Sequence, residues 1–442
     1  MRLKWAALLL FVGWGFSAGM TQSLAHEREA RLGTGINFTN WLEAYWHVPN
    51  YPEAGKYQRA DILEMKETGM KTIRLPVTFQ LFTDTVAPYA VDMNHAAMAW
   101  VDSVIDWAAQ EDMYLVIVNQ HGWDLTNDNF QQKIPRMQAM WRQLIQRWGH
   151  LDPERYFFEI LNEPPVGMLP ANVEILMQAC IDTIRAWDST HTLVIDAHSA
   201  TLGWALATTT PYPDTNLIYT FHTYDPYYFT HQGFSWAEPF PFPTGTPFPF
   251  LGDDQQLVTI FQQVADWRDQ NEKPVWLGEF GVGIFADATS RCNWVRLVGS
   301  LIDQYQLNWL YWDWGGVLPS DFDIFDQQGP SASNCIPCFR EALHLYPEVS
   351  STSPEFSADD LFLFPQPAHH ELTLRLGKAL PKGAHIRILD LQGRIHWQSA
   401  FSAQPAFSNH TIPVTDLAAG LYLLEITTSH STFYRRFTTL QP

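Results

Sequence analysis

The chain has 442 residues, enough for one domain of about 250–300 residues and a second, smaller one. Hydrophobic residues make up 46% of it and charged residues 17%, which supports a buried core and excludes the intrinsically disordered class. The formal net charge of −20 repels phosphate backbones and anionic membranes, which argues against nucleic acid as a partner.

The N-terminus has the pattern of a secretory signal peptide. Arg2 and Lys4 precede an apolar run over residues 5–16, and small residues lead to Ala25. The run is too short to span a bilayer, and no other segment reaches the length of about 18 apolar residues that a span needs. We therefore expect residues 1–25 to be removed, with secretion of the chain and no stable membrane insertion.

Eight short β-rich runs follow, and helical patterns lie between most of them. The stripe of Leu257, Phe261 and Val264 is one such helical pattern. Eight β-α units predict a (β/α)8 TIM barrel over residues 26–347, in the α/β class. A doubly wound open sheet is the alternative, but no G-x-G-x-x-G turn follows the first strand. The eight predicted strands cover residues 35–39, 72–77, 114–119, 156–161, 192–196, 217–221, 275–278 and 309–312.

A different pattern begins after the barrel. Residues 348–360 are rich in Ser, Thr, Pro and acidic residues, which is typical of a linker. Residues 361–442 hold short strands separated by turn residues, which predicts a small all-β sandwich that few contacts tie to the barrel. Its predicted strands cover residues 372–376, 386–389, 395–397, 412–414, 421–426 and 433–437.

The four cysteines are expected to serve structure. Cys180 lies on an apolar helical stripe and is expected to be a buried thiol. Cys335 and Cys338 lack further ligands at the spacing of a zinc site. Because export permits disulfides, we expect Cys292 to bond one of these two, and the sequence leaves the choice open.

Polar residues end most of the predicted barrel strands, where the active site of a TIM barrel lies. Two of them are carboxylates, Glu163 after the fourth strand and Glu279 after the seventh. Nearby loops could satisfy two such carboxylates by hydrogen bonding. The Arg, His, Tyr and Trp residues at the other strand ends favour a shared site instead. Paired carboxylates are the groups that hydrolysis of a glycosidic bond needs, one as a proton donor and one as a nucleophile or base. The other strand ends carry Arg74, His121, Asn162, His222, Tyr224 and Trp312.

These eight positions, in this order, resemble glycoside hydrolase family 5, a large family of retaining cellulases and mannanases. The resemblance covers about residues 33–347. It implies that Glu163, in Asn162-Glu163-Pro164, is the acid/base and that Glu279 is the nucleophile. It also implies substrate-binding or supporting roles for the rest, without cofactor or metal: Arg74, His121, Asn162, His222, Tyr224 and Trp312.

Individual roles follow from the same resemblance. Arg74 and Tyr224 would support the nucleophile, Asn162 would bond the sugar 2-hydroxyl, and Trp312 would stack under the −1 sugar. Gln120 departs from the pattern, because many relatives carry a second histidine there. The polysaccharide substrate expected first is β-1,4-glucan, with β-mannan and β-1,3-glucan behind. A non-catalytic polysaccharide-binding protein on the same fold is the alternative from another class.

Residues 361–442 resemble the C-terminal sorting domain of the type IX secretion pathway. The matching segments are residues 364–367, 388–394 and 416–426. The resemblance implies the secretion machinery as a partner, and a cell-surface or secreted location. A carbohydrate-binding module is the second interpretation, but Trp397, Phe401, Phe407 and Tyr422 share no strand face by spacing.

Two further segments have open interpretations. Asp321, Asp323 and Asp326 could suggest calcium, but a solvated acidic loop is favoured because no regular ligand series follows. The Pro- and Phe-rich insertion at residues 239–250 is expected on the active face, either as a cleft wall or packed onto the barrel.

Overall fold

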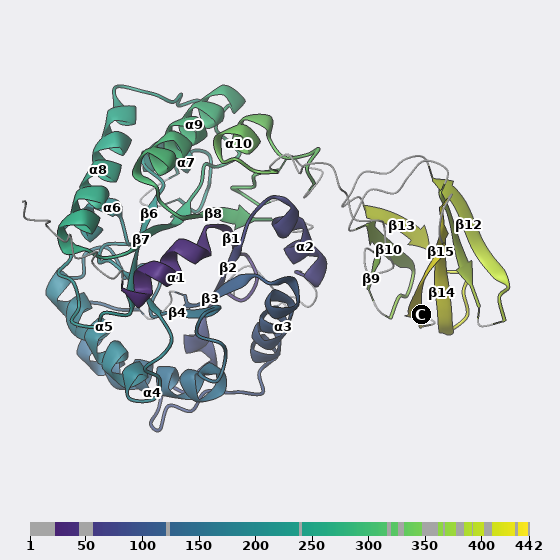
Figure 1. The fold of residues 1–442 in the computed structure, drawn as a ribbon, viewed down its shortest axis with the longest axis horizontal. Coiled ribbons are helices and arrows are strands. Elements are labelled where there is room, and N and C mark those ends of the chain that lie inside the picture. The colour runs from purple at the N-terminus through teal and green to yellow at the C-terminus, as the bar shows by residue number, and fades with distance from the viewer. Residues whose placement is uncertain are drawn as a thin grey trace, which may run out of the picture.

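The computed structural model describes most of the chain as a barrel domain and a small β domain (Figure 1). His121, the predicted linker and most of the predicted signal peptide lie outside the described residues. The description covers residues 23–43, 56–120, 124–237, 241–315, 320–325, 331–346, 361–365, 367–376, 384–390, 392–401, 409–428 and 432–440.

Eight parallel strands close into a barrel in sequence order, as predicted, with β1 paired to β8. The strands begin and end within a few residues of the predicted runs. β6 and β7 extend further, because polar residues at their ends remain paired in the barrel: His222 pairs with Glu279 and Thr223 with Phe280. The strands are β1 (Thr34–Phe38), β2 (Thr72–Val77), β3 (Tyr114–Asn119), β4 (Tyr156–Glu159), β5 (Leu193–Asp196), β6 (Leu217–Thr223), β7 (Val275–Phe280) and β8 (Trp309–Trp314).

Helices surround the barrel and bury their apolar stripes against it. The predicted stripe of α8 is buried, including Leu257, Phe261 and Val264. Among the described residues, no helix is both long and apolar enough to cross a membrane. The helices around the strands are α2 (Arg59–Glu67), η1 (Phe79–Phe82), α3 (Ala96–Glu111), α4 (Phe130–Trp148), α5 (Pro170–Arg185), α6 (Gly203–Leu206), α7 (Tyr227–Thr230), α8 (Asp253–Asn271), α9 (Ala288–Tyr305) and α10 (Pro337–Ala342).

The inside of the barrel is a packed core rather than a pore. Gly35 of β1 belongs here because a side chain would clash, since an added Cβ would lie 2.1 Å from the Thr72 carbonyl oxygen. The interior cluster is Leu32, Val116, Val118, Phe157, Val194, Ile218, Trp276 and Leu310.

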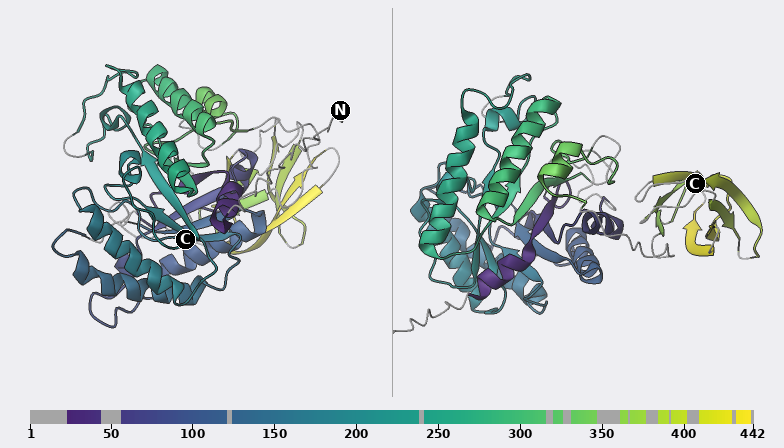
Figure 2. Two further views of the ribbon diagram at one scale, coloured as in Figure 1. Left: turned by 60° about the vertical axis from the view of Figure 1, so that its left-hand side comes forward. Right: turned by 45° about the horizontal axis from the view of Figure 1, so that its top comes forward.

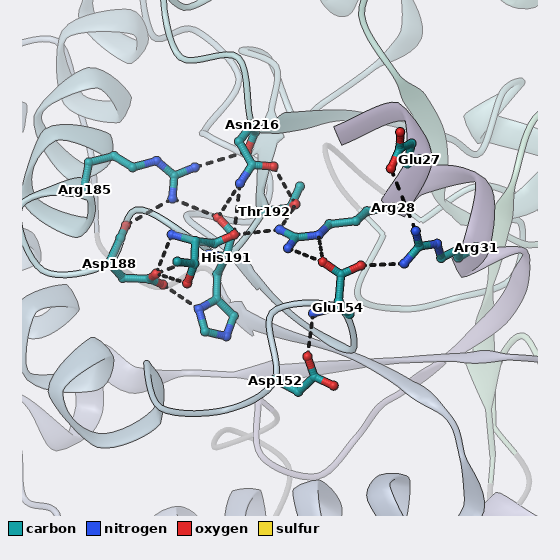
Figure 3. Close-up of polar contacts among 11 residues, drawn as sticks. Glu27, Arg28, Arg31, Asp152, Glu154, Arg185, Asp188, His191, Thr192 and Asn216 are labelled. Carbon is teal, nitrogen blue, oxygen red and sulfur yellow. Dashed lines mark hydrogen bonds and ion pairs between the residues drawn. The ribbon is translucent and has the colours of Figure 1, made fainter. Parts of the chain in front are cut away.

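Helix α1 (Leu24–Leu32) covers the opposite end, where the strands begin (Figures 1 and 3). Arg28 is 3% exposed and donates to the carbonyl oxygen of Thr190 at 2.6 Å and to Thr192 Oγ1 at 3.0 Å, just before β5. It also donates to Glu154, ahead of β4, at 2.5 Å. The predicted cleavage after Ala25 falls in the first turn of α1, and this boundary stays a prediction.

The C-terminal domain consists of two antiparallel sheets, ordered β13-β10-β9 and β12-β11-β14-β15. Its core is separate from that of the barrel. The right-hand view of Figure 2 shows the domain beside the barrel rather than within it. The strands are β9 (Leu361–Phe364), β10 (Glu371–Leu376), β11 (Ala384–Leu389), β12 (Ile395–Phe401), β13 (Asn409–Pro413), β14 (Gly420–Thr427) and β15 (Thr432–Thr439).

The cysteines have the structural roles that were expected. Cys292 of α9 is bonded to Cys338 of α10, which settles the choice that the sequence left open. Cys180 and Cys335 are buried free thiols. Burial raises the pKa of each to about 12, so neither is a reactive thiolate at neutral pH.

Candidate active site

Two carboxylates face each other at the open end of the barrel. Glu163 follows β4 at a φ of 46°, and its backbone N–H donates to Asp196 Oδ1 of β5 at 3.1 Å. Its side chain is 30% exposed, whereas that of Glu279 in β7 is only 5% exposed. The first carboxylate is therefore open to the pocket, and the second lies deeper.

Arg74 of β2 lies beneath the pair and uses all five of its N–H groups. It is fully buried. Two N–H groups go to Glu159, with Nε at 2.8 Å and Nη2 at 2.5 Å. The others go to Glu279 at 2.6 Å, Asn162 at 2.6 Å and Asn37 at 2.8 Å. One guanidinium thus positions four side chains that come from three strands, β1, β4 with its end, and β7.

Each oxygen of Glu279 accepts a hydrogen bond. Oε1 accepts from Arg74, and Oε2 accepts from the Tyr224 hydroxyl at 2.9 Å. His222 of β6 lies between the carboxylates, with Nδ1 2.8 Å from Glu163 Oε1 and 3.7 Å from Glu279 Oε2. These three side chains bring ligand atoms within 4.8 Å of one another.

Burial shapes the charge states of the site. Burial raises the pKa of Glu163 to about 7, with the Arg74 charge opposing the rise and Glu159 adding to it. Burial lowers the pKa of His222 to about 4, so its imidazole is neutral near pH 7. Burial also raises the pKa of Glu279, with the Glu163 charge adding to the rise, while Arg74 and the Tyr224 hydroxyl act against it. Burial thus shifts both carboxyls toward the protonated form, and Glu279 is the one with an arginine and a tyrosine donor on its two oxygens.

A pocket of about 510 Å³ opens over the pair. Its described lining includes Glu163, Glu279 and the half-buried Trp312 of β8. A groove of about 570 Å³ near α10 is lined by Cys335, Arg340 and Glu341, and it contains no facing pair of carboxylates.

An aromatic group forms one side of this pocket. Trp236 is 47% exposed, stacks on Phe234 and donates from Nε1 to Asp321 Oδ2 at 3.3 Å. Two phenylalanines in the described part of the nearby insertion pack onto the barrel: Phe248 is 3% exposed against Phe229, and Phe242 packs edge-on to Tyr227, whereas Phe250 is 42% exposed. None of residues 241–250 lines the pocket, which favours the packing interpretation over a cleft wall for this part.

The structure brings seven of the eight predicted site residues to this end of the barrel. His121 lies outside the described residues, whereas the neighbouring Gln120 lines the pocket. The seven are Arg74, Asn162, Glu163, His222, Tyr224, Glu279 and Trp312.

Three buried polar residues of the site were missed by the sequence analysis. They are Glu159, Asn37 and Asp196, all at most 1% exposed. A signal was present, since an acidic or amide residue inside an apolar strand is costly unless it is paired. Glu159 and Asn37 lie inside their predicted strands, whereas Asp196 ends the fifth strand and was missed at a strand end.

The acidic loop is only partly solvated, which corrects its predicted character. Asp321 is exposed, but Asp323 is 3% exposed and accepts from the backbone N–H of Phe325 at 3.0 Å. Asp326 lies outside the described residues. A cation site fits Glu163, His222 and Glu279 poorly, because Glu279 already has an arginine and a tyrosine donor on its two oxygens.

Comparison with known proteins identifies two family matches. The family described as cellulase, glycosyl hydrolase family 5, matches residues 33–317, more than half of the chain. A second family, the secretion system C-terminal sorting domain, matches residues 362–439.

Similar proteins agree with the first match. Endoglucanase 3 of Fibrobacter succinogenes is 28% identical over 67% of this chain and 51% of its own length. Endoglucanase H of Acetivibrio thermocellus is 29% identical over 68% of this chain and 32% of its own. The chain thus spans about half and about a third of these two relatives.

Solved structures extend the comparison. The structure of Thermotoga maritima Cel5A in complex with cellobiose is 29% identical in sequence. It has a TM-score of 0.63 and covers 72% of this chain and 99% of that one. The same enzyme has been solved with mannotriose, with the same identity, coverage and TM-score.

Proposed function

Since the chain belongs to glycosyl hydrolase family 5, the cellulase family, we propose that it is a retaining endoglucanase that hydrolyses β-1,4-glucan. The spacing of the carboxylates carries this proposal. Retaining glycosidases hold the two groups about 5–5.5 Å apart, and inverting ones about 6.5–9.5 Å apart to admit a water. Oxygens of Glu163 and Glu279 lie within 4.8 Å of each other, which supports the retaining geometry.

In the first step, a Glu279 oxygen attacks the anomeric carbon while the bond from that carbon to the leaving oxygen breaks. Glu163 gives its proton to that oxygen, which departs as a free hydroxyl. The pKa of about 7 keeps much of Glu163 protonated at neutral pH, as this role requires. In the second step, Glu163 takes a proton from water, whose oxygen displaces Glu279 from the anomeric carbon.

The surrounding groups have supporting roles in this proposal. Arg74 and Tyr224 hold the Glu279 oxygens in line and stabilise the charge that returns to them in the second step. Because the Asn162 side-chain oxygen already accepts from Arg74, its amide nitrogen is the donor that it offers to the sugar 2-hydroxyl. Trp312 supplies an aromatic face for the −1 sugar, and His121 is a further proposed substrate contact. The proposed steps require no cofactor or metal.

The substrate is proposed from the relatives. Both curated relatives are named endoglucanases, which puts β-1,4-glucan first. The Thermotoga maritima structure with mannotriose makes β-mannan the second candidate. The test is release of reducing ends, and loss of viscosity, on soluble β-1,4-glucan, β-mannan and β-1,3-glucan. Cleavage within β-1,4-glucan chains would support the proposal, whereas polysaccharide binding without turnover on any of the three would overturn it.

The route of export is part of the proposal. We infer that residues 1–25 direct the chain to the periplasm and that residues 361–442 take it across the outer membrane through the type IX machinery. The sorting-domain match over residues 362–439 supports the second step.

A further inference from the structure

The outer face of the sheet β13-β10-β9 has unexpected chemistry. In β10, Leu374 and Leu376 point into the core of the C-terminal domain, so Arg375 points the other way. Yet Arg375 is only 2% exposed. Beside it on β9, Phe362 pairs with Arg375 and Phe364 pairs with Thr373, so this face also carries two aromatic residues. A buried arginine and two aromatic residues on the outer face of a sheet require another part of the chain to pack over them.

Helix α2 of the barrel supplies that cover. Arg375 Nη1 donates to Asp61 Oδ1 at 3.1 Å, and Asp61 is fully buried in the first turn of α2. The other contacts of Asp61 belong to the barrel: Oδ2 accepts from the backbone N–H of Gln58 at 2.8 Å, and Oδ1 accepts from Trp314 Nε1 at 3.3 Å. Figure 1 shows α2 on the side of the barrel that faces the C-terminal domain. This buried ion pair joins two domains that were expected to share few contacts.

A second carboxyl, Glu64, lies three residues further along α2, on the same face of the helix. Glu64 is fully buried, and its Oε1 accepts from the Tyr346 hydroxyl at 2.8 Å. Burial raises the pKa of Glu64 to about 8, and the charge of Arg375 acts in the opposite direction. Within the described part of the chain, Glu64 Oε2 has no hydrogen-bond partner, and neither do Arg375 Nε and Nη2. Unmatched acceptor and donors from the two domains are therefore buried in the same site.

Residues from both ends of the barrel sequence build this site. We call Asp61, Glu64, Trp314 and Tyr346 the arginine socket. Asp61 and Glu64 come from α2, early in the barrel, whereas Trp314 ends β8 and Tyr346 follows α10. These segments meet where β8 pairs with β1 to close the barrel. The socket is complete only in a closed barrel.

We propose that Arg375 docks the C-terminal domain onto the barrel of the full-length chain, and that the occupied arginine socket braces the seam between β1 and β8. The two phenylalanines of β9 support the same contact. Phe362 and Phe364 share a groove of about 470 Å³ with Ala60 of α2 and Trp107 of α3. The proposal does not depend on the enzymatic function.

The test compares full-length variants by small-angle X-ray scattering. Arg375→Met removes the charge but keeps much of the side-chain volume. Arg387→Met is the matched control, because Arg387 pairs with Glu425 inside the same domain and is 41% exposed. We expect Arg375→Met to increase the radius of gyration and the control to scatter as the unaltered chain does. Equal scattering from all three proteins would overturn the docking.

Calorimetry tests the brace on the same proteins. We expect Arg375→Met to lower the unfolding temperature of the barrel, because Asp61 is left buried without its cation. A barrel that unfolds at the unaltered temperature while the scattering has expanded would overturn the brace. If Arg375→Met unfolds the C-terminal domain itself, Asp61→Asn decides, since it weakens the contact from the barrel side. Unchanged scattering from Asp61→Asn would then overturn the docking.

Discussion

At the scale of single residues, the site depends on one buried cation among three glutamates. Arg74 contacts Glu159 and Glu279 directly. The charges of Arg74 and Glu159 also act on Glu163. The neutral His222 adds no charge near pH 7. Because Arg74 pairs directly with Glu159 and Glu279 but not with Glu163, an excess of buried carboxylates favours a proton on Glu163.

This charge balance predicts the pH dependence of activity. Glu163 must be protonated to act as an acid, and its pKa is raised to about 7. We therefore expect kcat/KM on β-1,4-glucan oligosaccharides to fall as the pH rises through about 7. An aryl glycoside with an acidic phenol leaving group needs little protonation and should show a weaker alkaline fall. Equal alkaline falls for both substrates, measured as pH profiles, would contradict the assignment.

Glu159 provides a prediction about stability. Glu159→Gln leaves the fully buried Arg74 without its two-pronged carboxylate partner. Breaking such a pair costs about 3 kcal/mol or more. We expect a loss of that size in the free energy of unfolding, together with reduced kcat, because Arg74 also positions Glu279.

Asp112→Asn is the control for this variant. Asp112 pairs with Arg155 at the surface and is 78% exposed, so its loss should cost less than about 1 kcal/mol. Denaturant unfolding of both variants measures the difference. A Glu159→Gln protein as stable as the control would show that Arg74 does not need this partner.

At the scale of elements, most of the fold could be predicted because β-rich runs alternate with helical patterns along the sequence. Barrel strands are apolar β-rich runs, and their ends needed only small corrections. The one described strand without a predicted counterpart, β9, reads Leu361-Phe362-Leu363-Phe364. It shows no polar alternation because one face packs in the domain core and the other faces the barrel, a contact that no local pattern reveals.

The residues of the site also divide into those that the sequence could predict and those that it could not. Residues at strand ends could be predicted, because the end of each strand is visible in the sequence. Glu159 and Asn37 could not be assigned partners, since strand pairing is not visible in the sequence: Glu159 reaches Arg74 from β4, two strands away, and Asn37 from the neighbouring β1.

Helix α1 provides a prediction at this scale. Arg28→Met removes a buried group that joins α1 to the segments before β4 and β5 (Figure 3). We expect a loss of about 2 kcal/mol of stability with little change in activity. Arg31→Met is the matched control, because Arg31 contacts the same Glu154 but is 46% exposed. Equal losses from the two variants in denaturant unfolding would show that burial of Arg28 contributes nothing.

At the scale of the whole molecule, the two domains have different tasks and share a buried contact. The barrel holds every described residue of the proposed active site, whereas the C-terminal domain matches a sorting domain. The ion pair between Arg375 and Asp61 joins them at α2.

Deletion of the chain after Pro354 separates these tasks. We expect the remaining barrel to hydrolyse soluble glucan, and to accumulate in the periplasm of the native host. Cell fractionation with an activity assay measures the location. Normal export, with activity lost only on insoluble polysaccharide, would instead favour a carbohydrate-binding module.

The most direct test of the central claim is to locate the covalent intermediate. In Glu163→Gln, an aryl β-cellobioside with an acidic phenol should still form the intermediate, but the base for its hydrolysis is missing, so it should accumulate. Mass spectrometry of the digested protein should then find one cellobiosyl unit on the peptide at Glu279, and none in the Glu163→Gln, Glu279→Gln double variant. A sugar bound to another carboxylate, or turnover with an inverted product and no adduct, would contradict the account.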